Sequence, residues 1–230
     1  MTTHDLHNTT NNKTSSTTDD QATDDQTTDD QTSAVSTRGW RVVDIVVTAV
    51  LGVAVGLVFW AWNTIGGIWF GAMDAITPGL GGLAVGVWLI GGVIGGLVIR
   101  KPGAALLVEL IAAAVSATLG NQWGITTLYS GLAQGIGAEL IFLAFLYRRF
   151  SIEVAVLAGI GAGVGAWVFE FFFSNRAKGA LFNSIYLGSL ALSGAVLAGL
   201  LGWVLVKALA GTGALDRFAA GREARTSKTA

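Results

Sequence analysis

Several residue types are missing or rare in this chain of 230 residues. It has no cysteine, only two prolines and only two histidines, His4 and His7, near its start. Without cysteine, the chain can form no disulfide, no thiolate nucleophile and no cysteine metal site. Because both histidines lie in a polar segment, imidazole takes no part in any chemistry of the apolar remainder. Charged residues make up 13% of the chain and apolar residues 52%, a composition that predicts an integral membrane protein.

An acidic tail is predicted at residues 1–37. This segment carries seven Asp and one Lys, a balance of −6, so the remaining chain is near +5 against the whole-chain charge of −1. A five-residue unit that begins with two Asp repeats from position 19 to 32. Such a segment buries too little apolar area to offset its ordering entropy, so we expect disorder. Calcium binding is the alternative, but the unit lacks the turn Gly and the closing Glu of an EF-hand loop.

Six apolar runs after the tail predict an all-α bundle of six transmembrane helices. The runs are 42–62, 80–99, 104–119, 128–147, 152–173 and 184–207. A span needs about 20 apolar residues, so 104–119 is short. The stretch 64–77 is broken by glycines and followed by Pro78, and we expect it to be re-entrant or interfacial rather than a seventh span. The predicted domains are the acidic tail 1–37, the six-helix membrane domain 38–210 and a basic cytoplasmic tail 211–230.

The positions of lysine and arginine predict the orientation, because these residues stay on the cytoplasmic side of a membrane. From Arg38 onward, six spans with the N-terminus inside place eleven of the thirteen basic residues in cytoplasmic regions and only Arg176 and Lys178 outside. We therefore predict a multi-pass protein of the plasma membrane with both termini in the cytoplasm and with outer loops at 120–127 and 174–183.

Three carboxylic acids interrupt the apolar runs: Glu109, Glu139 and Glu170. An ionisable group in hydrocarbon costs several kcal/mol unless it faces protein, water or a ligand, so each acid needs a partner. Glu109 lies about 7 Å from the inner end of its run at the usual helical rise. There we expect an ion pair with one of the basic residues at 100, 101, 148 and 149. For Glu139, near the middle of the membrane, a structural role and a ligand role both stay open.

Glu170 is the strongest candidate for ligand binding. It shares a helix face with Gly163 and Trp167, so its carboxylate projects beside an indole from a surface of small residues. A carboxylate next to an aromatic face suits a cationic or nitrogen-heterocyclic ligand. The alternative is an ion pair with Arg176 or Lys178 in the next loop.

Other polar and aromatic side chains gather at the same depth and predict a pocket that opens to the outside. Its expected members are Glu170, Trp167, Asn121, Trp123, Gln134 and Tyr186, with Glu139, Asn63 and Trp60 as weaker candidates. The tryptophans have an alternative explanation, since a membrane protein commonly places Trp and Tyr in belts at the headgroup level. We expect no catalytic residue, metal or cofactor.

Four segments of the chain together resemble one family. They are Arg100-Lys101-Pro102-Gly103-Ala104-Ala105 followed by Glu109-Leu110, then Gly120-Asn121-Gln122-Trp123-Gly124, then Gln134-Gly135-Ile136-Gly137-Ala138-Glu139, and Tyr147-Arg148-Arg149. Over about residues 40–210, the chain resembles the YkoE family. These are substrate-binding S components of energy-coupling factor (ECF) vitamin transporters, linked to thiamine or its hydroxymethylpyrimidine precursor.

The resemblance implies partners. They are a transmembrane T component and two ATP-binding cassette (ABC) ATPase subunits, and the expected docking face on the first helix is formed by Ala49, Gly52, Val53 and Gly56. Gly52 and Gly56 also form a small-residue ridge, which either admits another membrane helix or packs inside the bundle. The chain contains no GxxxxGK[ST] phosphate loop, so ATP would be hydrolysed by the partners.

The predicted function is therefore substrate capture rather than enzymatic catalysis. The alternative is an autonomous ion-coupled transporter or channel in which Glu109, Glu139 and Glu170 form an ion path; the sequence shows no inverted repeat in support of it. An intramembrane hydrolase is disfavoured, because the serines in the apolar runs have no histidine beside them in those runs.

Overall fold

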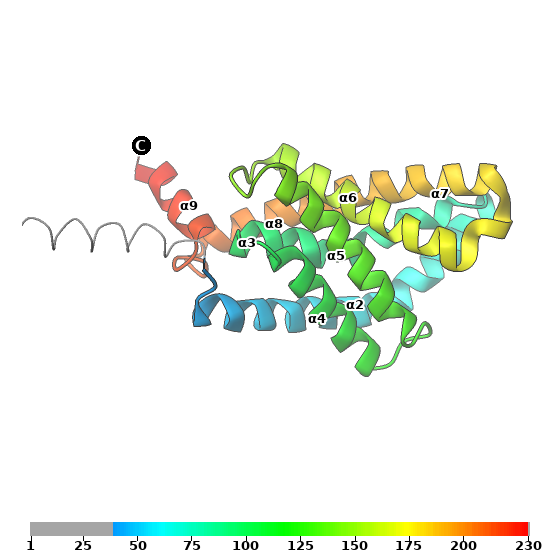
Figure 1. The fold of residues 1–230 in the computed structure, drawn as a ribbon, viewed down its shortest axis with the longest axis horizontal. Helices are drawn as coiled ribbons and strands as arrows, with labels where there is room; N and C mark the ends of the chain where they lie inside the picture. Colours follow the sequence, from blue (N-terminus) through cyan, green and yellow to red (C-terminus); the bar gives the residue numbers. More distant parts are fainter. Residues whose placement is uncertain (1–38, 230) are drawn as a thin grey trace, which may run out of the picture. The chain divides into compact units, whose positions relative to one another are not determined.

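The computed structural model of the protein describes residues 39–229, so the predicted tail 1–37 lies outside the described residues. Residues from Trp40 onward pack as one compact unit. All regular elements within the described range are helical. They are α2 (Val42–Ile76), η1 (Leu80–Leu89), α3 (Ile90–Ile99), α4 (Ala104–Thr118), α5 (Thr126–Ala144), α6 (Ile152–Glu170), η2 (Phe171–Asn175), η3 (Arg176–Lys178), α7 (Gly179–Ser193), η4 (Gly194–Leu200), α8 (Leu201–Gly211) and α9 (Ala219–Thr229) (Figure 1).

Six passes through the membrane follow from these elements, which confirms the predicted bundle. By length and apolar composition alone, three continuous helical stretches could span a bilayer: Val42–Ile76, Leu80–Ile99 and Ile152–Gly211. The last has 60 residues, too many for one pass. It reverses at Gly179, whose positive φ of 85° is easy only for glycine, and so makes two passes (Figure 1). The shorter helices α4 and α5 complete the six.

The pass formed by η1 and α3 lies at the centre of the bundle. Every residue of α3 is buried, and the helix contacts α2, α4, α5, α6 and α8. Glycines make this possible because they let neighbouring helices approach closely. A Cβ at Gly95 would lie 2.7 Å from Val108 Cβ on α4, and one at Gly96 would overlap the ring of Phe142 on α5.

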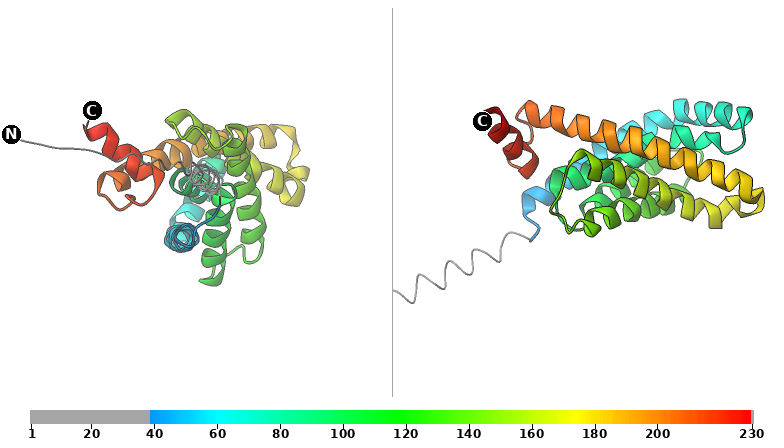
Figure 2. Two further views of the ribbon diagram at one scale, coloured as in Figure 1. Left: turned by 60° about the vertical axis from the view of Figure 1, so that its left-hand side comes forward. Right: turned by 90° about the horizontal axis from the view of Figure 1, so that it is seen from above.

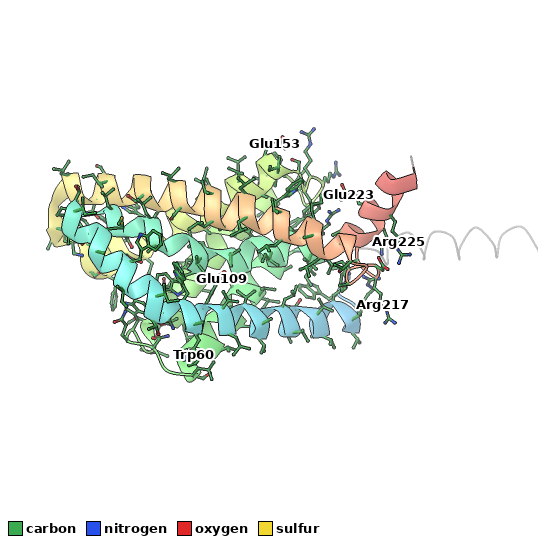
Figure 3. The ribbon with its side chains drawn as sticks, turned by 180° about the vertical axis from the view of Figure 1, so that it is seen from behind. Trp60, Glu109, Glu153, Arg217, Glu223 and Arg225 are labelled. Atoms are coloured by element: carbon green, nitrogen blue, oxygen red, sulfur yellow. The ribbon has the colours of Figure 1, made fainter. Side chains whose placement is uncertain are left out.

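The first helix is longer than predicted. α2 continues without a break from Val42 to Ile76, a length of 35 residues, or about 52 Å at 1.5 Å per residue. This exceeds the roughly 30 Å of bilayer hydrocarbon. Residues 64–76 thus continue the first helix rather than form a separate re-entrant segment, and the helix bends toward the rest of the bundle along this part (Figures 1 and 3). Following the predicted orientation, we call the end of the bundle at this continuation the outer end and the opposite end, at α9, the inner end. Just before this part, the indole N–H of Trp62 donates to the carbonyl of Ala84, at 3.0 Å, and ties the first helix to η1.

The predicted basic tail 211–230 contains a folded element. Helix α9 packs against α8 and α3 at the inner end of the bundle (Figure 2). Leu215 and Phe218 in the preceding turn are buried, and Glu223 forms an ion pair of 2.7 Å with Arg100. The C-terminal segment therefore belongs to the bundle over most of its described length.

Candidate substrate-binding site

A cavity of about 440 Å³ lies in the outer half of the bundle, next to the α4–α5 loop and the α6–α7 turn. Its charged and polar lining residues are Asn63, Glu109, Gln122, Thr126, Thr127, Ser130, Gln134, Glu170, Ser174, Asn175 and Lys178. Its aromatic lining residues are Phe59, Phe70, Trp88, Trp123, Phe169, Phe173, Phe182 and Tyr186. A pocket with apolar walls and a few convergent polar groups is typical of a small-molecule site.

Glu109 forms the deep end of this cavity. It is 1% exposed, and its Oε2 accepts a hydrogen bond of 2.6 Å from the backbone N–H of Gly92 on α3. The neighbouring Gly91 leaves room for the carboxylate, because a Cβ there would lie only 2.8 Å from the same oxygen. The absence of a side chain at Gly91 thus lets the carboxylate lie directly against a transmembrane helix, where the N–H of Gly92 binds it.

Gln134 on α5 completes the deep end. In the orientation that satisfies its neighbours, its amide nitrogen donates to Glu109 Oε1 at 3.1 Å and to the carbonyl of Trp88 at 3.0 Å. Its oxygen accepts from the hydroxyl of Ser130 at 2.7 Å. A carboxylate has about four acceptor sites, so Glu109 can still accept hydrogen bonds from a ligand.

The structure does not give Glu109 the ion pair that its depth predicts. Among the described residues, no cation lies within salt-bridge distance of it, and the nearby basic side chains bind other acids: Lys101 pairs with Asp44 at 2.7 Å and Arg100 with Glu223 at 2.7 Å. The physical reason is orientation, since Glu109 faces α3 and α5 rather than the loops at the inner end.

Two tryptophans form part of the cavity wall. The rings of Trp88 and Trp123 meet edge to face with centroids 5.3 Å apart. The indole N–H of Trp88 donates to Asn63 Oδ1 at 2.9 Å, and the Asn63 amide donates to the hydroxyl of Ser116 at 3.0 Å. Asn63 therefore lines the cavity while holding Trp88 in place.

The outer end of the cavity has a second carboxylate, Glu170. Tyr186 on α7 donates its hydroxyl hydrogen to Glu170 Oε2 at 2.5 Å. The ring of Tyr186 stacks on that of Phe182 with centroids 5.6 Å apart. The ammonium of Lys178 lies 4.5 Å from the centre of the Phe182 ring. Within the described residues, no cation reaches salt-bridge distance of Glu170, although Lys178 is close enough to interact with it electrostatically.

The structure brings together five of the predicted site residues, namely Glu170, Trp123, Gln134, Tyr186 and Asn63. Two other predicted site residues, Trp167 and Asn121, do not line the cavity. The Trp167 indole N–H donates to the carbonyl of Asn183 at 3.0 Å, so its polar edge is turned away from the cavity. Asn121 shapes the loop that carries Trp123, because its Oδ1 accepts from the backbone N–H of Trp123 at 2.9 Å and of Gly124 at 2.7 Å.

Glu139 and Trp60, which the sequence predicts as weaker site residues, do not line this cavity. Glu139 accepts hydrogen bonds from the backbone N–H groups at the start of α4 and from the Tyr147 hydroxyl; the distances are 2.6 Å to Gly103, 2.9 Å to Ala105, 3.2 Å to Leu106 and 2.5 Å to Tyr147. A helix N-terminus is a natural site for an anion. Trp60 is 47% exposed on the outer surface of α2 (Figure 3).

Sequence reasoning did not place Trp88, Lys178 and Glu109 in this cavity, which all three line. Trp88 falls inside an apolar run with no polar neighbour to mark it. The Gly91-Gly92 pair was the available signal for Glu109, since adjacent glycines in a span often mark a close approach.

The predicted docking face is divided between two surfaces. Gly52 and Gly56 are buried against α4, where a Cβ would lie 2.5 Å from Ile111 Cγ2 and 2.6 Å from Val115 Cβ, respectively. These two glycines therefore pack inside the bundle. Ala49 and Val53 are exposed on the surface of α2.

Comparisons with known proteins agree with this fold. Residues 43–165 match the family described as "ABC-type cobalt transport system, permease component". The chain is 37% identical over 194 residues to the protein named "Putative HMP/thiamine permease protein YkoE" of Bacillus subtilis (strain 168), covering 83% of this chain and 95% of the relative. A solved structure titled "Crystal structure of an S-component of ECF transporter" matches with a TM-score of 0.71 and 33% identity, over 83% of this chain and 96% of that chain. The chain is thus a multi-pass membrane protein with relatives in transport rather than catalysis, and it belongs to the YkoE family of ECF transporter S components.

Proposed function

We propose that this S component captures thiamine or its hydroxymethylpyrimidine (HMP) precursor from the outside, for uptake driven by ATP hydrolysis in partner subunits. The name of the Bacillus subtilis relative supports the ligand class. The observation that carries the proposal is the arrangement of one cavity with two acidic ends, Glu109 with Gln134 at depth and Glu170 at the outer end, separated by aromatic walls.

The deep end suits an aminopyrimidine. Such a ring presents an amino group that donates hydrogen bonds and ring nitrogens that accept them. The Glu109 carboxylate can accept hydrogen bonds from the amino group, while the donors of Gln134 and Ser130 are used within the protein and hold that carboxylate in place. The indoles of Trp88 and Trp123 offer apolar surfaces to the ring.

The outer end suits a cation. Glu170 supplies a negative charge, and the rings of Phe182 and Tyr186 supply aromatic faces. The thiazolium ring of thiamine is cationic, and a cation over an aromatic face gains about 0.5 to 2 kcal/mol. Thiamine would then use both ends of the cavity, whereas HMP, which lacks the thiazolium, would use the deep end.

Orientation and energy supply belong to the same proposal. The positions of Lys and Arg support cytoplasmic termini and an outward-facing cavity. Because the chain has no phosphate loop, we propose a transmembrane T component and two ABC ATPase subunits as partners. The exposed residues Ala49 and Val53 on α2 are the proposed contact with the T component.

The ion-path alternative is weakened by the place of Glu139. A path would need this acid in line with Glu109 and Glu170, but Glu139 is bound to the start of α4 and does not line their cavity.

The test is calorimetric titration of the detergent-solubilised protein with thiamine and with HMP. We expect both to bind, and Glu109→Gln to weaken both by roughly 1.5 to 3 kcal/mol, the scale of a charged hydrogen bond. Glu153→Gln is the matched control, because Glu153 is an exposed acid at the start of α6. Absence of binding to the wild-type protein, or equal affinity of the wild type and Glu109→Gln, would contradict the proposal.

A further inference from the structure

Lys178 places a cation at the rim of the proposed binding cavity, where the side chain is also exposed to solvent. Together with Arg176, it is one of the two basic residues near the outer turn, and it lines the same cavity as Glu170. Its Nζ atom lies over the ring of Phe182, 4.5 Å from the ring centre, and it interacts electrostatically with the Glu170 carboxylate.

The surroundings of this ammonium have the chemistry of a cation site. Phe182 stacks on Tyr186 with an interplanar angle of 23°, and Phe70 meets Tyr186 edge to face with centroids 6.3 Å apart. The hydroxyl of Tyr186 is bonded to Glu170, so the aromatic group and the carboxylate are held together. Aromatic faces beside a carboxylate attract organic cations as well as lysine.

We propose that Lys178 is an internal competitor for the cation subsite and thereby sets the preference of the protein between cationic and neutral ligands. Its ammonium interacts with Phe182 and Glu170, so a cationic ligand must displace it or tolerate its charge. A lysine is suited to this role, because its flexible stem lets the ammonium move into water when the ligand enters. The inference rests on the proposed function for the identity of the ligand, thiamine with its thiazolium cation.

The sign of the effect follows from the charges. The ammonium of Lys178 repels a thiazolium. It also partly neutralises the charge of Glu170 and covers the face of the Phe182 ring, so both attract the ligand less. Removal of the lysine charge should therefore raise the affinity for thiamine, by roughly threefold to tenfold for like charges several ångströms apart in a partly solvated site. HMP is neutral and binds at the deep end, so its affinity should not change.

The experiment compares three variants with the wild type by calorimetric titration with thiamine and with HMP at low and high salt. Lys178→Met keeps the stem and removes the charge, whereas Lys178→Arg keeps a positive charge. Arg176→Met is the matched control, since Arg176 is an exposed cation two residues away that does not line the cavity. The unchanged affinity of each variant for HMP reports that the cavity is intact.

The expected result is tighter thiamine binding by Lys178→Met alone, with a smaller gain at high salt because mobile ions screen the repulsion. Unchanged or weaker thiamine binding by Lys178→Met would overturn the inference while leaving the proposed function in place. An equal gain in Arg176→Met would also overturn it, because the effect would then be one of general surface charge. If the wild type binds neither ligand, the proposed function fails, and the inference fails with it.

Discussion

The carboxylates of the inner end and those of the outer cavity have different partners. Asp44, Glu139 and Glu223 at the inner end are bound by cations or by several protein donors, whereas Glu109 and Glu170 border a cavity. Asp44, Glu109, Glu139 and Glu170 all lie within apolar segments or at their edges, and composition does not separate them. What separates them is whether the protein itself provides enough donors.

The inner end binds its acids with groups that are close in space but far apart in the sequence. Asp44 on α2 is fully buried and pairs with Lys101 at 2.7 Å in the turn before α4 and with Arg41 at 3.0 Å. Glu139 on α5 accepts three backbone N–H groups of α4 and the hydroxyl of Tyr147. These contacts join α2, α4 and α5, so the comparison suggests that inner acids serve stability and outer acids serve binding.

The largest effect on stability should come from Glu139→Ala. Loss of the carboxylate leaves the first N–H groups of α4 and the Tyr147 hydroxyl without their acceptor, which should lower the free energy of unfolding by about 3 kcal/mol. Thermal unfolding in detergent measures this change. Glu153→Ala, which removes an exposed acid, is the control. A loss of ligand affinity without a loss of stability would contradict the assignment of Glu139 to the inner framework.

Unlike Glu139→Ala, Glu170→Gln should lower ligand affinity rather than the stability of the fold. The variant keeps the shape but removes the charge, so thiamine should bind more weakly by roughly 1.5 to 3 kcal/mol and neutral HMP by less. Titration with both ligands gives the two values. Equal losses for the two ligands would show that Glu170 does not distinguish a cation.

The predicted docking face has a buried half, Gly52 and Gly56, and an exposed half, Ala49 and Val53. One substitution in each half distinguishes packing inside the bundle from docking of a partner. Gly52→Leu should overpack the contact with α4 and destabilise the fold by about 1 to 3 kcal/mol. Ala49→Leu, on the exposed surface of α2, should leave stability and ligand affinity unchanged but reduce transport by blocking close approach of the T component. Uptake assays with the complete transporter and unfolding of the isolated chain distinguish the two outcomes. Normal uptake by Ala49→Leu would place the docking surface elsewhere.

Trp123→Ala should have a smaller effect than these substitutions, and it should act on ligand affinity. The substitution removes an edge-to-face contact with Trp88 and part of the cavity wall, so ligand affinity should fall by about 0.5 to 1.5 kcal/mol. Trp60→Ala is the matched control, because the Trp60 side chain is exposed on α2 and faces away from the bundle (Figure 3). Equal effects of the two substitutions on binding would mean that the tryptophans act only through the membrane interface.

The smallest effect concerns Glu223 at the inner end. The hydrogen bond with Arg100 lowers the pKa of Glu223 below its ordinary value of 4.5. Its contribution to stability is therefore present above pH 4.5 and is lost as the pH falls through the lowered pKa. Because the side chain is 55% exposed, solvent screening limits the contribution to about 0.5 kcal/mol. Thermal unfolding should show Glu223→Gln slightly less stable than wild type at pH 7, with no difference at strongly acidic pH; a difference that grows on acidification would contradict this account.

The six spans and part of the site could be predicted because they depend on local properties of the sequence. Apolar runs define the spans, and depth along a helix places Glu170, Gln134 and Tyr186 in the outer half. Depth does not give the direction in which a side chain points. Phe59 and Asn63 line the cavity one helical turn apart, whereas Trp60 is turned by about 100° from Phe59 and points away.

Most of the site that could not be predicted from the sequence depends on contacts between segments that are far apart in the chain. The sequence around Glu109 offers basic residues as partners, but the structure supplies Gly92 from another helix and Gln134 from a third. The partner of Glu139 is likewise the start of α4, about 34 residues earlier in the chain. Which donors meet which acid depends on how the helices pack, and no periodicity within one helix contains that information.

The donor that Gly92 presents to Glu109 has a genetic consequence. It is a main-chain N–H, and among the common amino acids only proline lacks one. A glycine codon and a proline codon differ at two bases, so no single-base change at this codon can delete the donor. A Cβ at position 92 would lie 3.2 Å from Ala138 Cβ and 3.6 Å from Glu109 Oε2. Point mutations at this codon can therefore press a side chain against Ala138 and beside the Glu109 carboxylate, but the main-chain donor itself is retained in every residue that they introduce.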